Sequence, residues 1–297
     1  MDSSSKPFKA GYAAIVGKPN VGKSTLMNAL LQQKLAIVSP RPQTTRNRIL
    51  GILNGIGYQI ILLDTPGIMH PEYSLQQSMV DAACTTMKEA DLLIMMIEPY
   101  PPDELDWTIM KKCGQLSMPK FLIINKIDRV PKHTLLPLID EMNQTSVFEA
   151  IIPVSALKQD GLQDLMDTLL EAMPAGEPLY PSDIISDEPE RFFVAELIRE
   201  KIFYQYGEEI PYATAVQIRS FEEHSGKKDY IHAVIVVERD SQKGILIGKQ
   251  GRAIKSLGSS SREAIENFLQ RSVFLELEVK VMKKWRKKFD LTRKMGY

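Results

Sequence analysis

The chain has 297 residues and a formal net charge of +0, and its 44% hydrophobic and 25% charged residues are typical of a soluble globular protein with room for two domains. Two cysteines, Cys84 and Cys113, exclude a disulfide framework, and no apolar run is long enough to cross a bilayer. Because Met1–Pro7 also lacks the apolar core of a secretory signal, we expect a cytoplasmic protein.

Residues 1–173 alternate short apolar runs with helical patterns, which predicts a doubly wound α/β domain with a mostly parallel sheet. The runs are apolar almost throughout, as expected of strands buried on both faces. The predicted strands are Tyr12–Val16, Gln59–Leu63, Leu92–Ile97, Lys120–Ile124 and Ile151–Val154. The predicted helices are Lys23–Gln32, Leu75–Glu89, Glu104–Gly114 and Leu162–Ala172.

A proline-rich segment, residues 174–190, is predicted to link this domain to a second one at residues 191–297. A helix at Arg191–Tyr206 opens the second domain, and Asp187 with Glu190 predicts a capping box at its start. Two strands, two helices and a third strand follow, so the order α-β-β-α-α-β predicts a smaller α+β fold.

Charge is distributed unevenly between these two parts. Residues 191–297 hold 21 Lys and Arg against 14 Asp and Glu, whereas residues 1–190 hold 16 against 23. A basic second domain suggests contact with a polyanion, and ordinary variation in surface charge is the alternative.

The first predicted helix begins with a phosphate-binding pattern. Residues 17–24, GKPNVGKS, are a complete P-loop sequence placed between an apolar strand and a helix. The glycines let backbone N–H groups surround phosphate oxygens at the helix N-terminus. Lys23 is expected to supply a charge to the β- and γ-phosphates, and the Ser24 hydroxyl is expected to bind Mg²⁺.

Three later motifs each follow a buried strand. Asp64 in residues 64–67, DTPG, is placed to complete the Mg²⁺ coordination, with the Gly67 N–H at the γ-phosphate. Asp128 in residues 125–128, NKID, predicts guanine specificity, because its carboxylate accepts from two N–H groups that adenine lacks. Residues 155–157, SAL, are expected to give a backbone N–H to guanine O6. The predicted nucleotide-binding residues are Gly17, Lys18, Pro19, Asn20, Val21, Gly22, Lys23, Ser24, Thr25, Asp64, Thr65, Pro66, Gly67, Asn125, Lys126, Asp128, Ser155, Ala156 and Leu157.

These motifs in this order resemble the translation-factor-related GTPases, and Thr44-Thr45-Arg46 resembles the first switch of their Era-like branch. The resemblance covers essentially the whole chain, including the segment that begins at Pro40. It implies GTP hydrolysis with Lys23, Thr45 and Gly67 as catalytic residues, and Mg²⁺ held by Ser24, Thr45 and Asp64. Thr44 is the alternative to Thr45 as the residue that closes over the γ-phosphate and Mg²⁺. The implied switch segments are Ile37–Asn47 and Ile68–Tyr73.

Ile68 stands where better-known GTPases have a glutamine that orients the attacking water, and the Era-like branch shares a hydrophobic residue there. We therefore expect slow intrinsic hydrolysis that a partner or a cation accelerates. Asn20 resembles the asparagine with which relatives help to hold K⁺, and a polar turn residue is the alternative reading.

Residues 248–251, GKQG, form a GxxG between two helices, and this context resembles a type II KH domain. The resemblance implies that the turn contacts RNA phosphates and that an adjacent groove, walled by Ile245 and Ile247, holds about four unpaired bases. The implied target of the monomer is the 3′ end of small-subunit ribosomal RNA in the small ribosomal subunit. The predicted RNA-binding residues are Lys243, Ile245, Ile247, Gly248, Lys249, Gln250, Gly251, Arg252, Lys255, Lys283, Lys284, Trp285 and Arg286.

The basic tail around Trp285 predicts phosphate contacts and stacking of the indole on a base. A basic segment with Trp also suits an anionic membrane surface, and the Era-like branch is known for partial membrane association. Three functions therefore stay open: a GTP-driven switch in small-subunit assembly, an RNA-binding module with a structural nucleotide, and a membrane-associated regulatory GTPase.

Overall fold

The computed structural model describes residues 7–39 and 41–297, so residues 1–6 of the predicted first domain and Pro40 of the predicted switch lie outside the described residues. The chain divides into two compact units. Ile37–Thr44, Pro71–Ser78 and Glu188–Tyr297 form the second unit, and the other described residues form the first. Two short segments from the N-terminal half thus belong to the unit that contains the C-terminal domain, which the sequence patterns did not predict.

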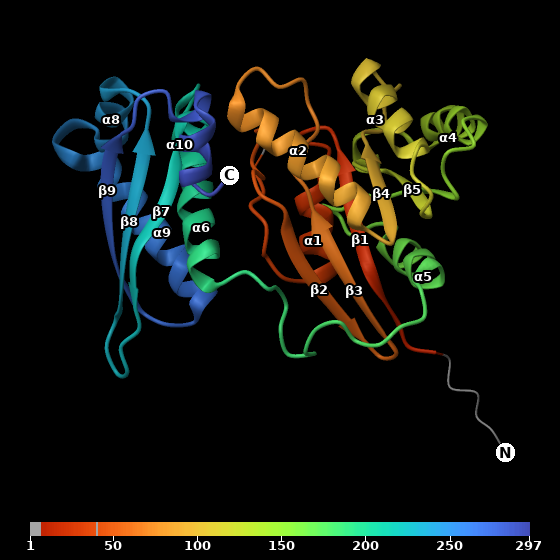
Figure 1. The fold of residues 1–297 in the computed structure, drawn as a ribbon, viewed down its shortest axis with the longest axis horizontal. Coiled ribbons are helices and arrows are strands. Elements are labelled where there is room, and N and C mark those ends of the chain that lie inside the picture. The colour runs from red at the N-terminus through yellow and green to blue at the C-terminus, as the bar shows by residue number, and fades with distance from the viewer. Residues whose placement is uncertain (1–6, 40) are drawn as a thin grey trace. The chain divides into compact units, whose positions relative to one another are not determined.

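The first unit is built on a six-stranded sheet with the strand order β2-β3-β1-β4-β5-β6. All neighbouring strands pair in parallel except β2, which runs antiparallel to β3. Helices lie on both faces of this sheet (Figure 1), which confirms the predicted doubly wound, mostly parallel fold. The strands are β1 (Lys9–Gly17), β2 (Ile49–Gly55), β3 (Tyr58–Asp64), β4 (Leu92–Ile97), β5 (Lys120–Ile124) and β6 (Ala150–Pro153). The helices are α1 (Lys23–Leu31), α2 (Ser74–Glu89), α3 (Glu104–Gly114), α4 (Leu135–Gln144) and α5 (Leu162–Ala172), and the first turn of α2 is grouped with the second unit.

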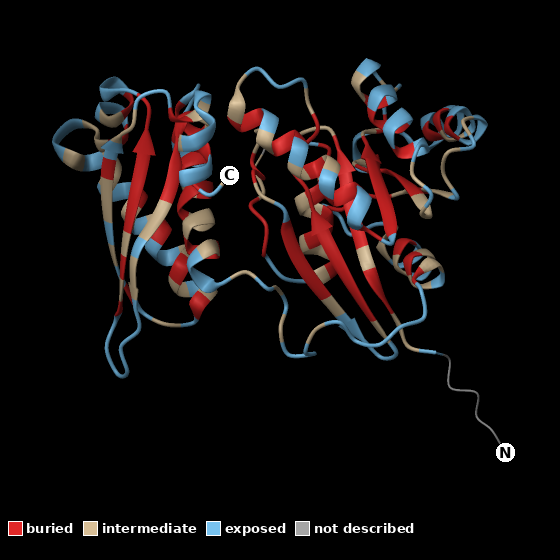
Figure 2. Ribbon diagram, viewed as in Figure 1, coloured by how far each residue is buried: buried red, intermediate tan, exposed pale blue. Residues whose placement is uncertain are grey.

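Burial explains why these strands read as continuous apolar runs. Every residue of β4 is buried, and buried residues fill the centre of the sheet (Figure 2). The sequence analysis did not predict β2, which contains Gly51, a residue unfavourable in strands. A Cβ atom at Gly51 would lie 2.5 Å from Leu31 Cδ1, so the glycine lets α1 pack closely on β2.

The proline-rich segment runs along the edge of the first unit's sheet. Ile52 N–H donates to the carbonyl of Ile185 at 2.8 Å, and Ser186 Oγ donates to the carbonyl of Leu50 at 2.6 Å. The side chain of Gln59 accepts from two further backbone N–H groups of the segment, at residues 179 and 180. The segment is therefore attached to β2 and β3 over much of its length.

The second unit contains a three-stranded sheet in the order β7-β8-β9, in which β7 and β8 are antiparallel and β8 and β9 are parallel. This sheet, with the helices around it, confirms the predicted α+β fold; the predicted elements occur in the predicted order, and α7 and α10 were not predicted. The strands are β7 (Ala215–Glu222), β8 (Asp229–Val237) and β9 (Val273–Val281). The helices are α6 (Glu190–Gln205), α7 (Ile210–Ala213), α8 (Asp240–Ile247), α9 (Arg252–Leu269) and α10 (Phe289–Lys294).

Helix α6 packs its apolar face into the core of the second unit, where Ile198 and Ile202 are fully buried. The predicted capping box at its start is wrong. The N-cap residue is Pro189, which has no side-chain acceptor, and Asp187 lies two residues too early to cap the helix. Glu190 instead forms an ion pair with Arg271 at 2.5 Å.

Candidate nucleotide site and nucleic-acid groove

The P-loop joins the end of β1 to the start of α1 through two glycines that no other residue can replace without strain. Gly17 has a φ of +147°, and a Cβ atom there would lie 2.4 Å from the carbonyl oxygen of Met96. Gly22 has a φ of +106°, and a Cβ atom there would lie 2.2 Å from Asn125 Nδ2. The loop therefore packs directly against β4 and against the motif that follows β5.

Lys23 is buried inside the turn of the P-loop, with 6% of its surface exposed. Its ammonium group donates to the carbonyls of Lys18 at 2.9 Å and Gly17 at 3.3 Å. Burial lowers the pKa of Lys23 to about 8, and the opposing charge of Asp64 only partly offsets this effect. A phosphate chain in the loop would stabilise the charged form of this lysine.

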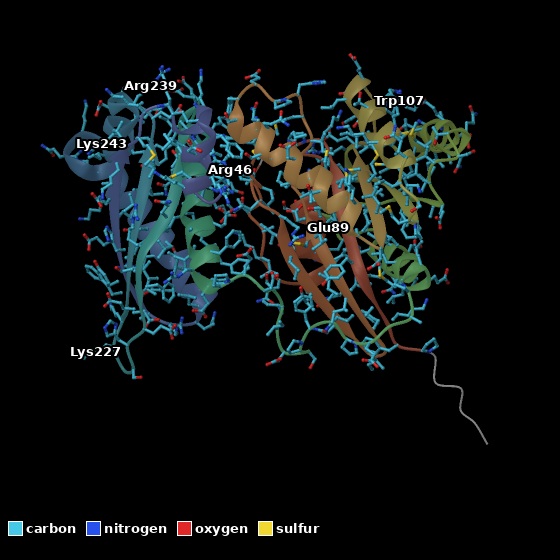
Figure 3. The ribbon with its side chains drawn as sticks, viewed as in Figure 1. Arg46, Glu89, Trp107, Lys227, Arg239 and Lys243 are labelled. Carbon is cyan, nitrogen blue, oxygen red and sulfur yellow. The ribbon has the colours of Figure 1, made fainter. Side chains whose placement is uncertain are left out.

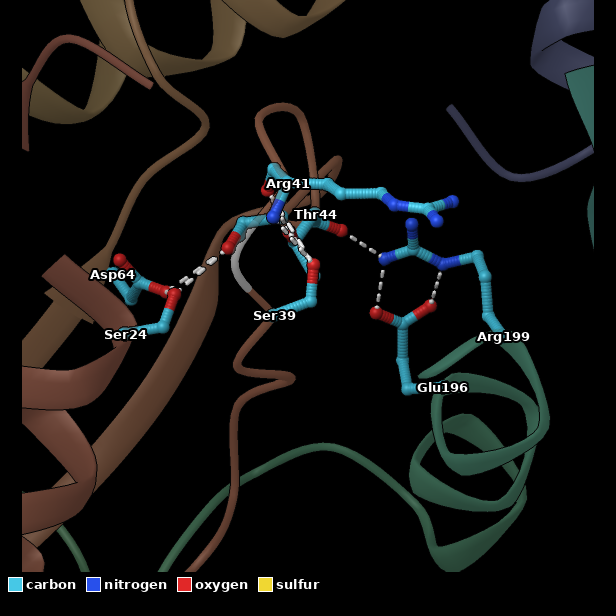
Figure 4. Close-up of polar contacts among 8 residues, drawn as sticks. Ser24, Ser39, Arg41, Thr44, Asp64, Glu196 and Arg199 are labelled. Carbon is cyan, nitrogen blue, oxygen red and sulfur yellow. Dashed lines mark hydrogen bonds and ion pairs between the residues drawn. The ribbon is translucent and has the colours of Figure 1, made fainter. Parts of the chain in front are cut away.

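Three oxygen donors from three separate elements meet beside Lys23. Ser24 Oγ lies 2.5 Å from Asp64 Oδ2 (Figure 4). Thr45 Oγ1 lies 2.9 Å from Ser24 Oγ and 3.3 Å from Asp64 Oδ2. Asp64 is fully buried, its Oδ1 atom has no hydrogen-bond partner, and burial raises its pKa to about 6. Two hydroxyls around a buried carboxylate with an unused oxygen fit Mg²⁺, which prefers oxygen ligands.

Thr44 does not join this cluster. Its hydroxyl donates to the carbonyl of Arg41 at 2.9 Å and lies 3.3 Å from Ser39 Oγ. Of the two adjacent threonines, Thr45 is therefore the one whose hydroxyl reaches Ser24 and Asp64.

The DTPG segment lies directly on the P-loop. A Cβ atom at Gly67 would lie 2.5 Å from the backbone nitrogen of Pro19, so only glycine fits there. The next residue, Ile68, is 2% exposed, packs in the core and donates its N–H to the carbonyl of Gly17 at 3.1 Å. A buried aliphatic side chain cannot orient a water molecule, so Ile68 is excluded as a water-positioning residue.

The motif after β5 connects the P-loop to the loop after β6. Asn125 Nδ2 donates to the carbonyl of Val21 at 2.8 Å, and its Oδ1 accepts from Ala156 N–H at 3.0 Å. Asp128 is exposed, and its Oδ1 accepts from Ser155 Oγ at 2.5 Å. Ser155 thereby orients the exposed carboxylate of Asp128.

Three acidic residues hold two lysines of this site, and the sequence analysis did not predict these ion pairs. Lys126 donates to the carbonyl of Asn20 at 2.6 Å and pairs with Glu98. Lys18 of the P-loop pairs with Asp103 at 2.6 Å and with Asp106 at 2.7 Å. Both aspartates stand at the start of α3, where Asp103 also forms a capping box with Asp106. Nothing in their spacing shows that this helix start lies beside the P-loop.

The GxxG turn of the second unit is tight and has three residues with positive φ. Gly248 has a φ of +70°, and a Cβ atom there would lie 2.6 Å from the Cβ of Ala253. Gln250 and Gly251 also have positive φ values, of 53° and 73°. The exposed side chains of Lys249 and Gln250 leave the turn's backbone accessible.

A groove of about 320 Å³ lies between α9 and β9 of the second unit. It combines an apolar floor with positive charge at its rim, which suits stacked bases and a phosphate backbone. Its lining is Lys228, Ile254, Lys255, Gly258, Ser259, Arg262, Val273, Phe274, Leu275 and Leu277.

Only Lys255 of the predicted RNA-binding residues lines this groove. Ile245 is 52% exposed on α8, and Ile247 packs against the core of the second unit. The sequence did carry a signal for the groove, because Ile254, Gly258 and Arg262 recur every four residues and so share one face of α9. Figure 3 shows Lys243 at the α8 end of this unit and Lys227 at the far end, in the turn between β7 and β8.

The prediction that Trp285 stacks on a base is wrong. Its side chain is fully buried, its indole N–H donates to the carbonyl of Ala213 at 2.9 Å, and its ring stacks on Tyr297. Arg286 forms an ion pair with Glu238 at 2.6 Å. Lys283 and Lys284 are exposed, so the basic charge of the tail faces solvent while its aromatic residue belongs to the core.

Fold and site together define a P-loop nucleotide-binding protein with a C-terminal KH domain. Residues 12–126 match the family described as 50S ribosome-binding GTPase, and residues 209–286 match the KH domain family. The chain is 44% identical to GTPase Era of Geobacter metallireducens over 296 residues, which is 99% of each protein. It is 42% identical to GTPase Era of Ruminiclostridium cellulolyticum over 98% of each protein. The chain therefore belongs to the GTPase Era family.

Two solved structures of Era are also similar to this chain. One is a single-residue variant of Aquifex aeolicus Era bound to GDP and AlF₄⁻, with a TM-score of 0.94 and 42% identity over 97% of this chain and 99% of that one. The other is Era in complex with MgGDPNP and nucleotides 1506–1542 of 16S ribosomal RNA, with a TM-score of 0.95 and 42% identity over 98% of this chain and 99% of that one. Among the described residues of the present chain, no helix is long and apolar enough to cross a membrane.

Proposed function

We propose that this chain is a GTP-hydrolysing switch that binds small-subunit ribosomal RNA near its 3′ end and acts in assembly of the small subunit. The observation that carries the proposal is the cluster of Ser24, Thr45 and Asp64 beside the buried Lys23, in a chain that also has a GxxG turn and an apolar groove. A family member that shares 42% identity binds both MgGDPNP and the 3′ nucleotides of 16S RNA.

In this proposal each nucleotide-site residue has a role that its geometry supports. Lys23 contacts the β- and γ-phosphates, and the Gly67 N–H binds the γ-phosphate from a segment that packs on the P-loop. Ser24, Thr45 and Asp64 hold Mg²⁺, which when bound neutralises charge on the phosphate oxygens. Thr45 is the ligand expected to depend on the γ-phosphate, so it distinguishes GTP from GDP.

Asp128 carries the proposed guanine specificity. Ser155 holds one carboxylate oxygen, and Asn125 holds the P-loop and the loop after β6 at a fixed separation. The carboxylate can then accept from the N1 and N2 donors of guanine, whereas adenine has no matching pair. ATP is therefore expected to bind much more weakly than GTP.

Slow intrinsic hydrolysis and stimulation by K⁺ are also part of the proposal. Ile68 is buried, and Asn20 is exposed on the P-loop with a φ of +67°. A side chain oxygen in that position suits a monovalent cation beside the phosphates. Replacing K⁺ by Na⁺ should lower the rate of hydrolysis, and equal rates in the two salts would rule out a role for Asn20.

The RNA-binding proposal places phosphates at the turn of Gly248–Gly251 and bases in the groove between α9 and β9. Lys249, Arg252 and Lys255 are exposed around the turn, and Ile254 and Leu275 offer apolar surface in the groove. Phosphate contacts then supply affinity, and the groove restricts binding to unpaired bases.

The experiment that tests this function is a titration of a fluorescent oligonucleotide with the 3′-terminal small-subunit sequence, at fixed salt, with GDP or with a non-hydrolysable GTP analogue. A difference in affinity between the two nucleotide states supports a switch. Lys249→Ala with Lys255→Ala should weaken binding, and Lys111→Ala on α3 is the matched control. Equal affinity in both states would favour an RNA-binding module with a structural nucleotide. Absence of RNA binding together with binding to anionic vesicles would favour the membrane-associated alternative.

A further inference from the structure

Helix α6 binds the backbone of the segment Ile37–Thr44, which belongs to the same compact unit. Tyr204 Oη donates to the carbonyl of Val38 at 2.9 Å, and the guanidinium of Arg41 donates to the carbonyl of Tyr206. Arg199 donates to the carbonyl of Thr44. The segment is therefore held at both of its ends by one helix and the residue that follows it.

Arg199 is the most deeply buried of the residues that make these contacts, with 1% of its surface exposed. Its Nε and Nη2 atoms pair with the two carboxylate oxygens of Glu196 at 2.8 and 2.6 Å (Figure 4). Its Nη2 also donates to the Thr44 carbonyl, and its Nη1 is buried without a hydrogen-bond partner. A buried arginine that satisfies only part of its donors costs stability. Packing alone does not explain why an arginine is buried at this position. The hydrogen bond to the Thr44 carbonyl suggests that Arg199 acts through Thr44.

The Thr44 carbonyl is separated from the magnesium cluster by a single residue. The peptide group is planar, so fixing the Thr44 oxygen also fixes the nitrogen and Cα of Thr45 in one plane. Only φ and χ1 of Thr45 then remain free between that plane and its hydroxyl, and χ1 is restricted in a β-branched residue. That hydroxyl lies 2.9 Å from Ser24 Oγ and 3.3 Å from Asp64 Oδ2.

We propose that Arg199 is a positioning residue for GTP hydrolysis, which holds Thr45 toward Ser24 and Asp64 by binding the Thr44 carbonyl while Glu196 fixes its guanidinium. The inference rests on the proposed function, because it assumes that Thr45 meets Mg²⁺ and the γ-phosphate. It adds a residue of the C-terminal half to the machinery of the nucleotide site, although that residue touches no nucleotide.

The inference predicts a selective defect. Loss of Arg199 releases Thr45, which is expected to contact only the triphosphate state, so hydrolysis should fall while GDP binding is kept. A misplaced catalytic group costs about 10- to 100-fold in rate. Arg199→Met should therefore lower the single-turnover rate of GTP hydrolysis by about that factor, with GDP affinity within about twofold of the wild type. Arg199→Lys keeps one charged donor without the planar fork, so it should recover part of the loss.

Two controls separate positioning from stability. Arg271→Met removes another arginine of the same unit, whose ion pairs among the described residues are with Glu190, Glu223 and Asp229. This variant should hydrolyse GTP at the wild-type rate. If Arg199→Met does not fold, the double variant Glu196→Gln with Arg199→Met is used in the kinetic assay in its place. The double variant removes both charges of the ion pair. Thermal unfolding of the full chain identifies which variants are folded.

A double-mutant cycle with Thr45→Ala supplies the decisive comparison. If Arg199 acts through Thr45, Arg199→Lys should change the rate by less than about twofold in the Thr45→Ala background. If the two substitutions lower the rate of GTP hydrolysis additively, the positioning role is wrong and the proposed function stands. The same holds if folded Arg199 variants hydrolyse GTP at the wild-type rate while Thr45→Ala is slow. A wild-type rate for Thr45→Ala itself would overturn both this inference and the role proposed for Thr45.

Discussion

Replacing Trp285 by alanine should destabilise the second unit, because this indole is the largest fully buried side chain among the described residues. Truncating a buried Trp to Ala costs about 3–5 kcal/mol through lost burial and the cavity left behind. The carbonyl of Ala213 also loses the indole N–H, which adds about 1 kcal/mol. Trp285→Phe keeps most of the packing and should cost only about 1–2 kcal/mol.

Urea unfolding of the full chain, followed by circular dichroism, measures this effect. With a slope of about 2 kcal/mol per molar urea, a loss of about 4–6 kcal/mol in Trp285→Ala should move the midpoint of the affected transition down by about 2–3 M. The sequence contains two tryptophans, and the other, Trp107, is 39% exposed. Trp107→Phe therefore leaves Trp285 as the single reporter, whose emission should show a shielded ring before unfolding and should not respond to RNA.

The opposite pattern would refute this reasoning. An unchanged midpoint in Trp285→Ala, combined with a loss of RNA affinity and with quenching of Trp285 emission by the oligonucleotide, would mean that the indole contacts a base. Below its unfolding midpoint, the folded Trp285→Ala protein should instead bind RNA with the affinity of the wild type.

Three further predictions concern single residues. Asp128→Asn should weaken GTP binding by about 100-fold or more, because two hydrogen bonds to a charged group are worth about 1.5–3 kcal/mol each. The variant should also bind xanthosine triphosphate. An unchanged GTP affinity in a calorimetric titration would contradict the role of Asp128. Gly248→Ala should lower RNA affinity more than Gly251→Ala, because both have positive φ but only Gly248 lacks space for a Cβ atom; equal affinities in the oligonucleotide titration would count against the turn geometry. At pH 8 a thiol reagent should modify Cys84 and spare Cys113, which is buried and whose pKa burial raises to about 12, until denaturant is added; mass spectrometry showing equal modification rates would refute this.

Much of the fold was predictable because local pattern and tertiary role agree. The strands Leu92–Ile97 and Lys120–Ile124 are apolar throughout because both faces of the sheet are covered, and their bounds were predicted as observed. The P-loop was predictable for a similar reason, because Gly17 and Gly22 have positive φ and no space for a Cβ atom, so no other residue type fits there. At such positions the sequence has little freedom, and it is correspondingly informative.

The missed features depend on contacts between segments that are distant in sequence. Gly51 weakens the strand pattern of β2 but makes room for α1, so its value appears only in three dimensions. Trp285 has the neighbours of a surface tryptophan in sequence, yet Ala213 and Tyr297 enclose it. Arg199 reads as an ordinary helix residue until Thr44, 155 positions earlier, is placed beside it.

The path of the proline-rich segment also bears on how the first unit avoids self-association. β2 is an edge strand, and an edge strand exposes unpaired N–H and C=O groups that can pair with another chain. Here the N–H of Ile52 and the carbonyl of Leu50 are already bonded to Ile185 and Ser186. A segment that connects two units thereby also protects the edge of a sheet. Shortening it or replacing it with a flexible sequence would expose an aggregation-prone strand even if both units kept their own folds.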